Sequence, residues 1–395
     1  MRRVAGRGRH RNRPLPGRRP ARHRSYRQSV WICTDVVGSD AAAEVFGKRI
    51  LVEISHTIER FALSAPADEP LVVVAMFQKL SYFEREAAVY EEIAARGALV
   101  IVGLAEDIPP RLAPGVRHAL IAASDPLARE WSVTVLGPRG GATLVAIDLE
   151  SVGADGDSLE AARLFRGRWS FRRAEAYREI YRLRAELPLL EQLGRRIDEH
   201  LHRVHAEPEP AEQDWREVPL RFTTDRIDQV LRERTELTRA RDDVHERDPR
   251  SGLYNGRFLA RWVDGLGDGT LPVGLALLRI HGIPEVRSRY GLRAELAALR
   301  AVARTLQHRL DEGDRAVRLG PQDFLVVLPS RTPDEVRALA DRMCHDLAGL
   351  DRSYPFVSLP ATVTSTVTRH RPLPLDRLRD ELDGAAPEDA AALVR

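Results

Sequence analysis

The stretch Ala316–Leu328, AVRLGPQDFLVVL, predicts two short strands joined by a tight turn. The strand segments are Ala316–Leu319 and Phe324–Leu328, and both are mostly apolar. Between them lie residues typical of a turn, Gly320-Pro321-Gln322-Asp323. The sequence therefore predicts a β-hairpin here, with Asp323 as the acidic residue beside its turn.

Helices and strands alternate around this hairpin. Val273–Ile280 (VGLALLRI) and Ala361–Thr368 predict two further strands, the first of them buried. Arg293–Leu310 predicts an amphipathic helix, because its large apolar residues recur on one face. Thr332 and Glu335 form a capping box that predicts the start of another helix. This pattern is typical of an α/β (α+β) domain with a central sheet flanked by helices.

A second block of alternating elements lies nearer the N-terminus and predicts a separate α/β domain. Its apolar patterns predict helices at Ile50–Phe61 and Phe83–Ala95, and a buried strand at Leu71–Phe77. A glycine-rich turn between Trp131–Leu136 and Ala142–Ile147 predicts a hairpin.

Composition divides the chain further. We expect a disordered Arg-rich tail (1–40), a first folded domain (41–187), a helical linker (188–247), a second folded domain (248–385) and a short tail (386–395). The linker contains AEPEPA and then a charged helical stretch with apolar residues every seven positions, Val230, Leu237 and Val244. Because the seam also includes Arg234 and Arg241, a homodimeric coiled coil and an ordinary solvated helix are both open interpretations.

The positive charge is concentrated at the N-terminus. Residues 1–34 contain 11 Arg and no acidic residue, so the remainder of this +3 chain carries 3 − 11 = −8. Such a tail is typical of a nucleic-acid-binding arm. It is also what a solvated tail, or a segment upstream of a start site near Val30, would look like. We favour the second interpretation and expect no nucleic-acid partner.

The rest of the composition excludes several classes of protein. No apolar run is long enough to span a membrane, so we expect no membrane partner. Two distant cysteines, Cys33 and Cys344, exclude a disulfide scaffold and fit a reducing, cytoplasmic location. Trp131 and Trp169 could line a ligand pocket, but aromatics beside apolar strands more often belong to a core. His56 could bind a ligand or sense pH, although the histidines lack metal-ligand spacing.

The second domain resembles the GGDEF domain of diguanylate cyclases, which join two GTP molecules into cyclic di-GMP. Its opening, DPRSGLYNGRFL from Asp248 to Leu259, is similar to the family's opening motif. Arg318-Leu319-Gly320-Pro321-Gln322-Asp323-Phe324 stands where the family has its signature hairpin, and Tyr290-Gly291 matches a conserved pair.

The first domain resembles the DICT sensory domain, which occurs joined to diguanylate cyclases. The similar residues are Ser55-His56-x-Ile58-Glu59, Phe77-Gln78, Asp125-Pro126-Leu127 and Phe165-x-Gly167-x-Trp169. The order of sensor, helical linker and GGDEF domain supports both resemblances together.

The resemblance implies that the residues of GGDEF chemistry have been replaced. The family's metal positions correspond to Arg279, His281 and Asp323, and only the last is acidic. A guanidinium at the first position would repel the divalent cation that the reaction needs. The family's guanine-reading positions correspond to Arg287 and Leu296, so we expect base recognition to be lost. We therefore expect no catalytic residues and no metal cofactor.

The hairpin itself also departs from the family. Pro321 replaces a glycine and removes an N–H, and Gln322 is uncharged. The family's C-terminal phosphate-contacting segment is not recognisable, and its inhibitory site is incomplete because Asp311 stands where an arginine belongs, three residues before Asp314.

The positions that support the fold persist. Asp248 and Arg318 correspond to a pair that latches the start of the domain to the hairpin, and Gly252, Asn255 and Phe324 also match the family.

These observations predict a cytoplasmic signalling protein with a DICT-like input domain and a catalytically degenerate GGDEF output domain. The output domain would act by forming a homodimer, by contacting an unknown protein partner, or by binding GTP or cyclic di-GMP without turnover. The alternative is an active diguanylate cyclase with a divergent metal site, in which Asp323 and His281 would bind Mg²⁺.

Overall fold

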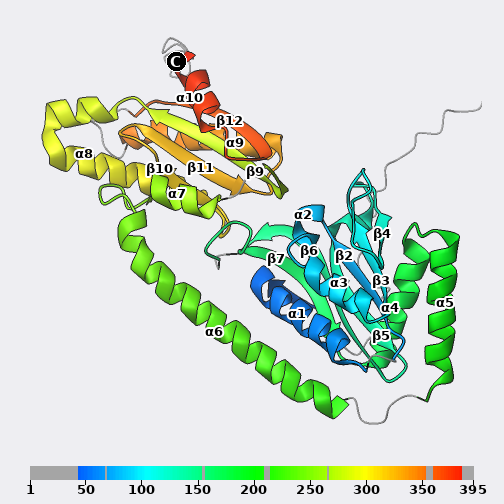
Figure 1. The fold of residues 1–395 in the computed structure, drawn as a ribbon. Coiled ribbons are helices and arrows are strands. Elements are labelled where there is room, and N and C mark those ends of the chain that lie inside the picture. Colours follow the sequence, from blue (N-terminus) through cyan, green and yellow to red (C-terminus); the bar gives the residue numbers. More distant parts are fainter. Residues whose placement is uncertain are drawn as a thin grey trace, which may run out of the picture. The chain divides into compact units, whose positions relative to one another are not determined.

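The computed structural model describes residues 43–66, 69–153, 156–208, 214–264, 267–352 and 359–384. The Arg-rich tail 1–40 and the C-terminal tail 386–395, predicted above, lie outside the described residues. The described chain forms two mixed sheets, each with its own helices (Figure 1). This arrangement confirms the expected mixed α/β class.

The first sheet has seven strands in the order β1-β7-β6-β5-β2-β3-β4. In chain order they are β1 (Glu44–Gly47), β2 (Val72–Phe77), β3 (Leu99–Leu104), β4 (Val116–Leu120), β5 (Glu130–Gly137), β6 (Gly140–Val152) and β7 (Arg163–Ser170). The predicted hairpin joins β5 and β6, with Gly137 opposite Gly140.

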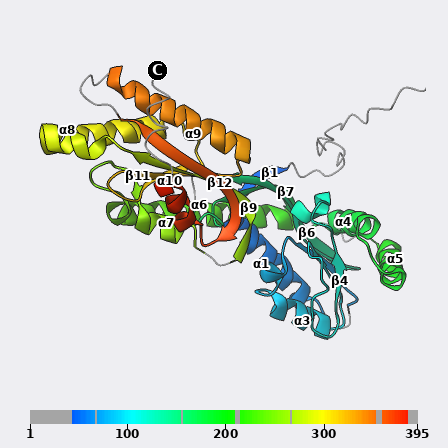
Figure 2. The same ribbon diagram turned by 90° about the horizontal axis from the view of Figure 1, so that it is seen from above.

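Helices cover both faces of this sheet, as Figure 2 shows. Alternate residues of a strand point to opposite faces. Val73 and Ala75 therefore pack under α1 (Lys48–Ser64) and α3 (Ala87–Ala95), whereas Val72 and Val74 pack under α4 and α5. The bounds of the second helix pair are α4 (Arg173–Glu186) and α5 (Glu191–Ala206).

Three features of this domain differ from the sequence-based expectation. The helix expected over Phe83–Ala95 is two helices, α2 (Leu80–Phe83) and α3, since the chain turns between them. The edge strands β1 and β4 were not expected, because their residues are partly exposed and carry no apolar run. Helix α5 lies in the stretch expected to be linker, yet it buries Ile197 and Leu201 against the first sheet.

The second sheet has five strands in the order β12-β9-β11-β10-β8. They are β8 (Tyr254–Asn255), β9 (Gly267–Ile280), β10 (Arg315–Arg318), β11 (Asp323–Pro329) and β12 (Ala361–Arg371). Its helices are α7 (Gly256–Trp262), α8 (Ile283–Gln307), α9 (Pro333–Ala348) and α10 (Leu375–Gly384).

The predicted hairpin forms the middle of this second sheet, because β11 pairs with both β10 and β9. One face packs against α8 and α9, and the other against α7 and α10. The capping box of α9 is present, with Thr332 and Glu335 bonding each other's backbone. Helix α8 begins ten residues earlier than expected and breaks at Gly291, where φ is 78°.

The linker stretch contains the long helix α6 (Asp214–Glu246). Of its heptad residues, Val230 and Leu237 are exposed, and the side chain of Val244 lies outside the described residues. Nowhere in the described ranges does a helix combine the length and apolar character that crossing a bilayer requires.

Candidate functional site

The signature hairpin holds a closed cluster of charges. Asp323, at the start of β11, lies directly opposite Arg279 on β9. Arg279 Nε donates to Asp323 Oδ1 at 2.8 Å and Nη2 approaches Oδ2 at 3.4 Å. Arg279 Nη1 also donates to Asp383 of α10. The hydrogen bonds that Arg279 donates to these two carboxylates raise its pKa, so a permanent cation occupies this corner of the sheet.

The other substituted positions are also engaged. His281 Nε2 lies 3.0 Å from Thr362 Oγ1 on the neighbouring strand. Arg287 Nη1 donates to Glu295 Oε2 at 3.1 Å, and Leu296 is half-buried beside that carboxylate.

Glu295 is a buried acid that sequence reasoning missed. It accepts from Arg287 and, at 3.2 Å, from Arg250, although its side chain is only 5% exposed. The available signal was a glutamate on the apolar face of α8, between Ala294 and Leu296. The sequence alone does not show that this glutamate is paired with Arg250 and Arg287, so it gives no reason to assign it a role.

The supporting residues of the hairpin form a separate latch. Arg318 Nη1 donates to Asp248 Oδ2 at 2.9 Å, and the backbone N–H and the hydroxyl of Ser251 donate to the same oxygen at 2.7 Å. Burial opposes ionisation, but the hydrogen bonds from Ser251 and Arg318 lower the pKa of Asp248. Gly252 has a φ of 78°, a conformation that favours glycine. Asn255 caps α7 by accepting from the backbone of Arg257 and Phe258.

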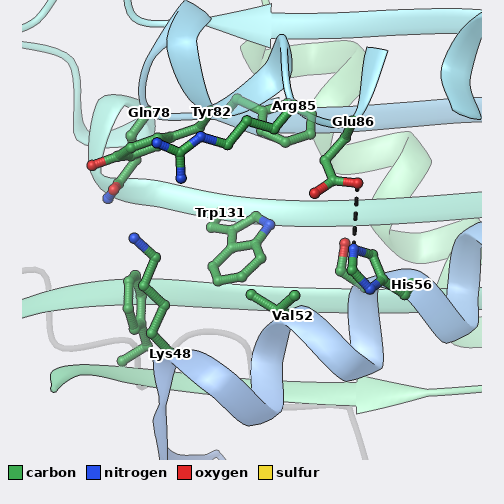
Figure 3. Close-up of a pocket in the computed structure, with 11 residues that line it drawn as sticks. Lys48, Val52, His56, Gln78, Tyr82, Arg85, Glu86 and Trp131 are labelled. Carbon is green, nitrogen blue, oxygen red and sulfur yellow. Dashed lines mark ion pairs between the residues drawn. The ribbon is translucent and has the colours of Figure 1, made fainter. Parts of the chain in front are cut away.

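A pocket in the first domain forms a second candidate site (Figure 3). Its cavity volume is about 110 Å³. It lies between α1, the end of β2 and the turn that follows α2, with β5 and β7 behind. The lining residues are Lys48, Val52, Ser55, His56, Phe77, Gln78, Tyr82, Arg85, Glu86, Trp131 and Phe165.

Cations gather at one end of this pocket. Lys48 Nζ contacts Glu160 Oε2 at 3.0 Å and lies 4.7 Å from the centre of the Tyr82 ring. Burial lowers the pKa of Lys48, and repulsion from Arg163 and Arg85 adds to this effect, whereas Glu160 opposes it. Against the cost of burial, Lys48 and Arg163 lower the pKa of Glu160 to about 2. Arg85 is exposed, and no carboxylate of the described chain forms an ion pair with it.

The opposite end carries acids and a histidine. His56 Nε2 lies 3.3 Å from Glu86 Oε2. Glu59, three residues after His56 on α1, accepts from Tyr90 Oη at 2.9 Å and from Ser55 Oγ at 3.3 Å. Burial raises the pKa of Glu59. Ligand atoms of His56, Glu59 and Glu86 lie within 4.8 Å of one another, a cluster that sequence reasoning did not anticipate because Glu86 comes from a separate turn.

Trp131 separates the two ends. Its Nε1 is buried and has no hydrogen-bond partner among the described residues. A buried donor left unpaired costs about 1–3 kcal/mol, so this N–H is available to a ligand. The two tryptophans thus behave differently: Trp131 lines the pocket, whereas Trp169 is a core residue with 4% exposure.

The chain thus has two α/β domains, each with its own candidate site. Residues 36–149 match the DICT family, a sensory domain of diguanylate cyclases and two-component systems, and residues 246–368 match the GGDEF domain of diguanylate cyclases. The chain therefore carries a DICT sensory domain followed by a GGDEF domain, which confirms both resemblances. This combination points to cyclic di-GMP signalling.

Solved structures with a similar fold include GGDEF proteins. The diguanylate cyclase SiaD of Pseudomonas aeruginosa, solved with its activator SiaC, is 21% identical over 56% of this chain and 79% of its own, with a TM-score of 0.34. The FimX GGDEF domain of the same organism is 18% identical over 37% and 94%, with a TM-score of 0.29. The GGDEF domain of DgcB from Caulobacter crescentus, solved with c-di-GMP, is 16% identical over 38% and 92%, with a TM-score of 0.30. No curated protein matches the chain.

Proposed function

We propose that this chain is a cytoplasmic signalling protein whose DICT domain receives the input and whose GGDEF domain acts without making cyclic di-GMP. The observation that carries the proposal is the position of Arg279, which donates to both Asp323 and Asp383. A GGDEF reaction needs divalent cations to neutralise the phosphates during attack of a ribose hydroxyl. In this domain the Arg279 guanidinium supplies the positive charge, and it already binds the Asp323 carboxylate that a cation would need.

Charge balance supports this proposal. Both oxygens of Asp323 face the Arg279 guanidinium, so a divalent cation would have to displace it. A cation that approached without displacing it would meet like-charge repulsion. His281 could offer one nitrogen, but that nitrogen already lies in contact with Thr362. The residues present therefore do not fit a Mg²⁺ or Mn²⁺ pair.

The guanine side of the site supports the same proposal. Arg287 stands where the family reads the base, and its guanidinium pairs with buried Glu295. Leu296 has no hydrogen-bonding atom on its side chain. Loss of base contacts together with loss of metal contacts is harder to compensate than either loss alone.

The domain would then act through binding. GTP or cyclic di-GMP bound without turnover, an unknown protein partner and a homodimer are the three modes that we propose. The exposed apolar residues Ile227, Val230 and Leu237 on α6 support the dimer.

A product assay tests the proposal. The full chain is incubated with GTP and either Mg²⁺ or Mn²⁺, and cyclic di-GMP is sought by mass spectrometry. An active diguanylate cyclase serves as the positive control. We expect no product from the chain, nor from its Asp323→Ala and Asp334→Ala variants, the latter changing an exposed aspartate of α9. Product from the wild type that disappears only in Asp323→Ala would establish the alternative, an active enzyme with a divergent site.

A further inference from the structure

The DICT pocket has hydrogen-bond donors that the protein itself does not use. The Lys48 ammonium has three N–H donors, and its ion pair with Glu160 leaves others free to turn toward the cavity. The positive charge of Arg85 adds to the burial that lowers the pKa of Lys48, and no carboxylate of the described chain forms an ion pair with Arg85. Figure 3 shows both side chains reaching the same end of the pocket. Two converging cations with spare donors are suited to a carboxylate.

The walls between the two ends are apolar and aromatic. Trp131 and Phe165 meet edge to face at 5.8 Å, and Val52 and Phe77 complete the lining. The cavity volume of about 110 Å³ is close to the roughly 150 Å³ of an engineered cavity that binds benzene. The space between the two ends is thus matched to a single ring rather than to a nucleotide.

The end of the pocket near His56 and Glu86 suits a ligand group that both accepts and donates a hydrogen bond. The unpaired Trp131 Nε1 lies on the side of the indole that faces His56 and Glu86 (Figure 3). A ligand hydroxyl there could accept from Trp131 Nε1 and donate to the Glu86 carboxylate. It would give the buried indole N–H the acceptor that it lacks.

We propose that the DICT pocket binds a small aromatic carboxylate that carries a hydroxyl group at its opposite end. The carboxylate contacts Arg85 and Lys48, the ring lies against Trp131, and the hydroxyl contacts Trp131 Nε1 and Glu86. This inference rests on the proposed role of the DICT domain as the input of the protein, and it names the chemical class of that input.

The pocket also indicates which molecules it should reject. A neutral phenol would offer no carboxylate to Arg85, and an aromatic amine would place a third positive charge beside Arg85 and Lys48. A ring without the hydroxyl would leave Trp131 Nε1 unpaired. The expected order of affinity is therefore 4-hydroxybenzoate, then benzoate, then phenol, with 4-hydroxybenzylamine last.

Calorimetric titration of the full chain with these four compounds tests the proposal. We expect saturable one-to-one binding of 4-hydroxybenzoate. Arg85→Gln should weaken it about tenfold or more, because a charge-assisted hydrogen bond is lost. Trp131→Phe keeps a ring but removes the N–H, so it should weaken 4-hydroxybenzoate several-fold and benzoate little. Arg111→Gln changes an exposed arginine of the same domain outside the pocket and should leave binding unchanged.

Three results would overturn the inference. They are the absence of saturable binding of both acids at millimolar concentration, equal binding of phenol and 4-hydroxybenzoate, and unchanged affinity in Arg85→Gln. Arg85 is exposed, so this variant should fold, and a melting curve checks that it does. The titration uses no GTP. Cyclic di-GMP formation would overturn the proposed function alone, whereas missing acid binding without product would overturn this inference alone.

Discussion

The GGDEF hairpin and the DICT pocket both contain arginines beside acidic side chains, but they differ in what remains unpaired. At the hairpin, Arg279 is matched by Asp323 and Asp383. In the pocket, Arg85 has no carboxylate partner in the described chain and Trp131 Nε1 has no acceptor. At the hairpin every charge named here has a counter-charge, whereas the pocket keeps a cation and an N–H donor without partners in the described chain.

On the two proposals above, this difference separates a site closed by its own ion pairs from a pocket that is open to a ligand. A buried or half-buried polar group without a partner is costly, so proteins keep few of them without a reason. Where each charge already has its counter-charge, a ligand must break an existing pair before it can bind. The predictions below test how much each paired group contributes to the stability of the fold.

The largest effect is expected for Arg163, which is fully buried behind the pocket. It donates to Asp148, to Gln78 Oε1 at 3.1 Å and to Glu160 Oε2 at 3.1 Å. Arg163→Met would leave the buried Asp148 carboxylate without its cation, so we expect the free energy of unfolding to fall by about 3–5 kcal/mol. Urea denaturation measures this change.

Arg166→Gln is the matched control for that variant. It alters an exposed arginine on the same strand, and we expect a change within about 0.5 kcal/mol. A loss in Arg163→Met no larger than in this control would show that the Asp148 carboxylate is not committed to Arg163.

The next comparison uses two arginines of the same sheet. Arg318 is 7% exposed and holds Asp248, whereas Arg279 is 22% exposed and holds Asp323. Arg318→Ala should cost about 2 kcal/mol, because hydrogen bonds to a charged group are lost at a buried site. Arg279→Ala should cost less than about 1 kcal/mol, as pairs nearer the surface usually do. If urea denaturation showed equal losses of stability for the two variants, the Arg318–Asp248 latch and the Arg279–Asp323 pair would not differ in strength.

A smaller effect is expected when the filled site is reopened. Arg279→Asp would replace the cation with a carboxylate facing Asp323, and Asp383 lies within reach of the same position. Oxygen-rich clusters of this kind bind Mn²⁺ or Mg²⁺. Millimolar Mn²⁺ should therefore raise the melting temperature of the variant by a few degrees, about 1 kcal/mol by mass action, and leave the wild type unchanged. A similar Mn²⁺ shift in the wild type would mean that Arg279 does not close the site.

Much of the fold could be predicted from local patterns, because strands such as Val72–Phe77 are buried on both faces and read as continuous apolar runs. The polar edge strand β4 lacks that signal, and the apolar spacing of α5 predicts a helix but not the sheet on which it packs. At the hairpin, Arg279 could be singled out in the sequence, but its partner Asp383 could not, because Asp383 lies on α10, 104 residues away. The pocket was harder still. Its residues come from α1, β2, the turn after α2, β5 and β7, and only their juxtaposition distinguishes Trp131 from Trp169.

The smallest effect is expected at Glu59, whose pKa is raised by burial. A carboxyl whose folded pKa exceeds its unfolded pKa stabilises the fold below the unfolded pKa, and this contribution is lost as pH rises through the folded pKa. Glu59→Gln keeps an acceptor for Tyr90 Oη without the buried charge. We therefore expect the variant to be about 0.5–1 kcal/mol more stable than the wild type at neutral pH, and the advantage to vanish near pH 4.

Urea denaturation of both proteins at a series of pH values measures this difference. His56 and Glu86 lie beside Glu59 in both proteins, so subtracting the two curves isolates the contribution of Glu59. Glu53→Gln, an exposed glutamate on the same helix, should show no such pH dependence. If Glu59→Gln were instead less stable at neutral pH, the Glu59 charge would be held by His56 as Glu86 is, and this end of the pocket would be as fully paired as the hairpin.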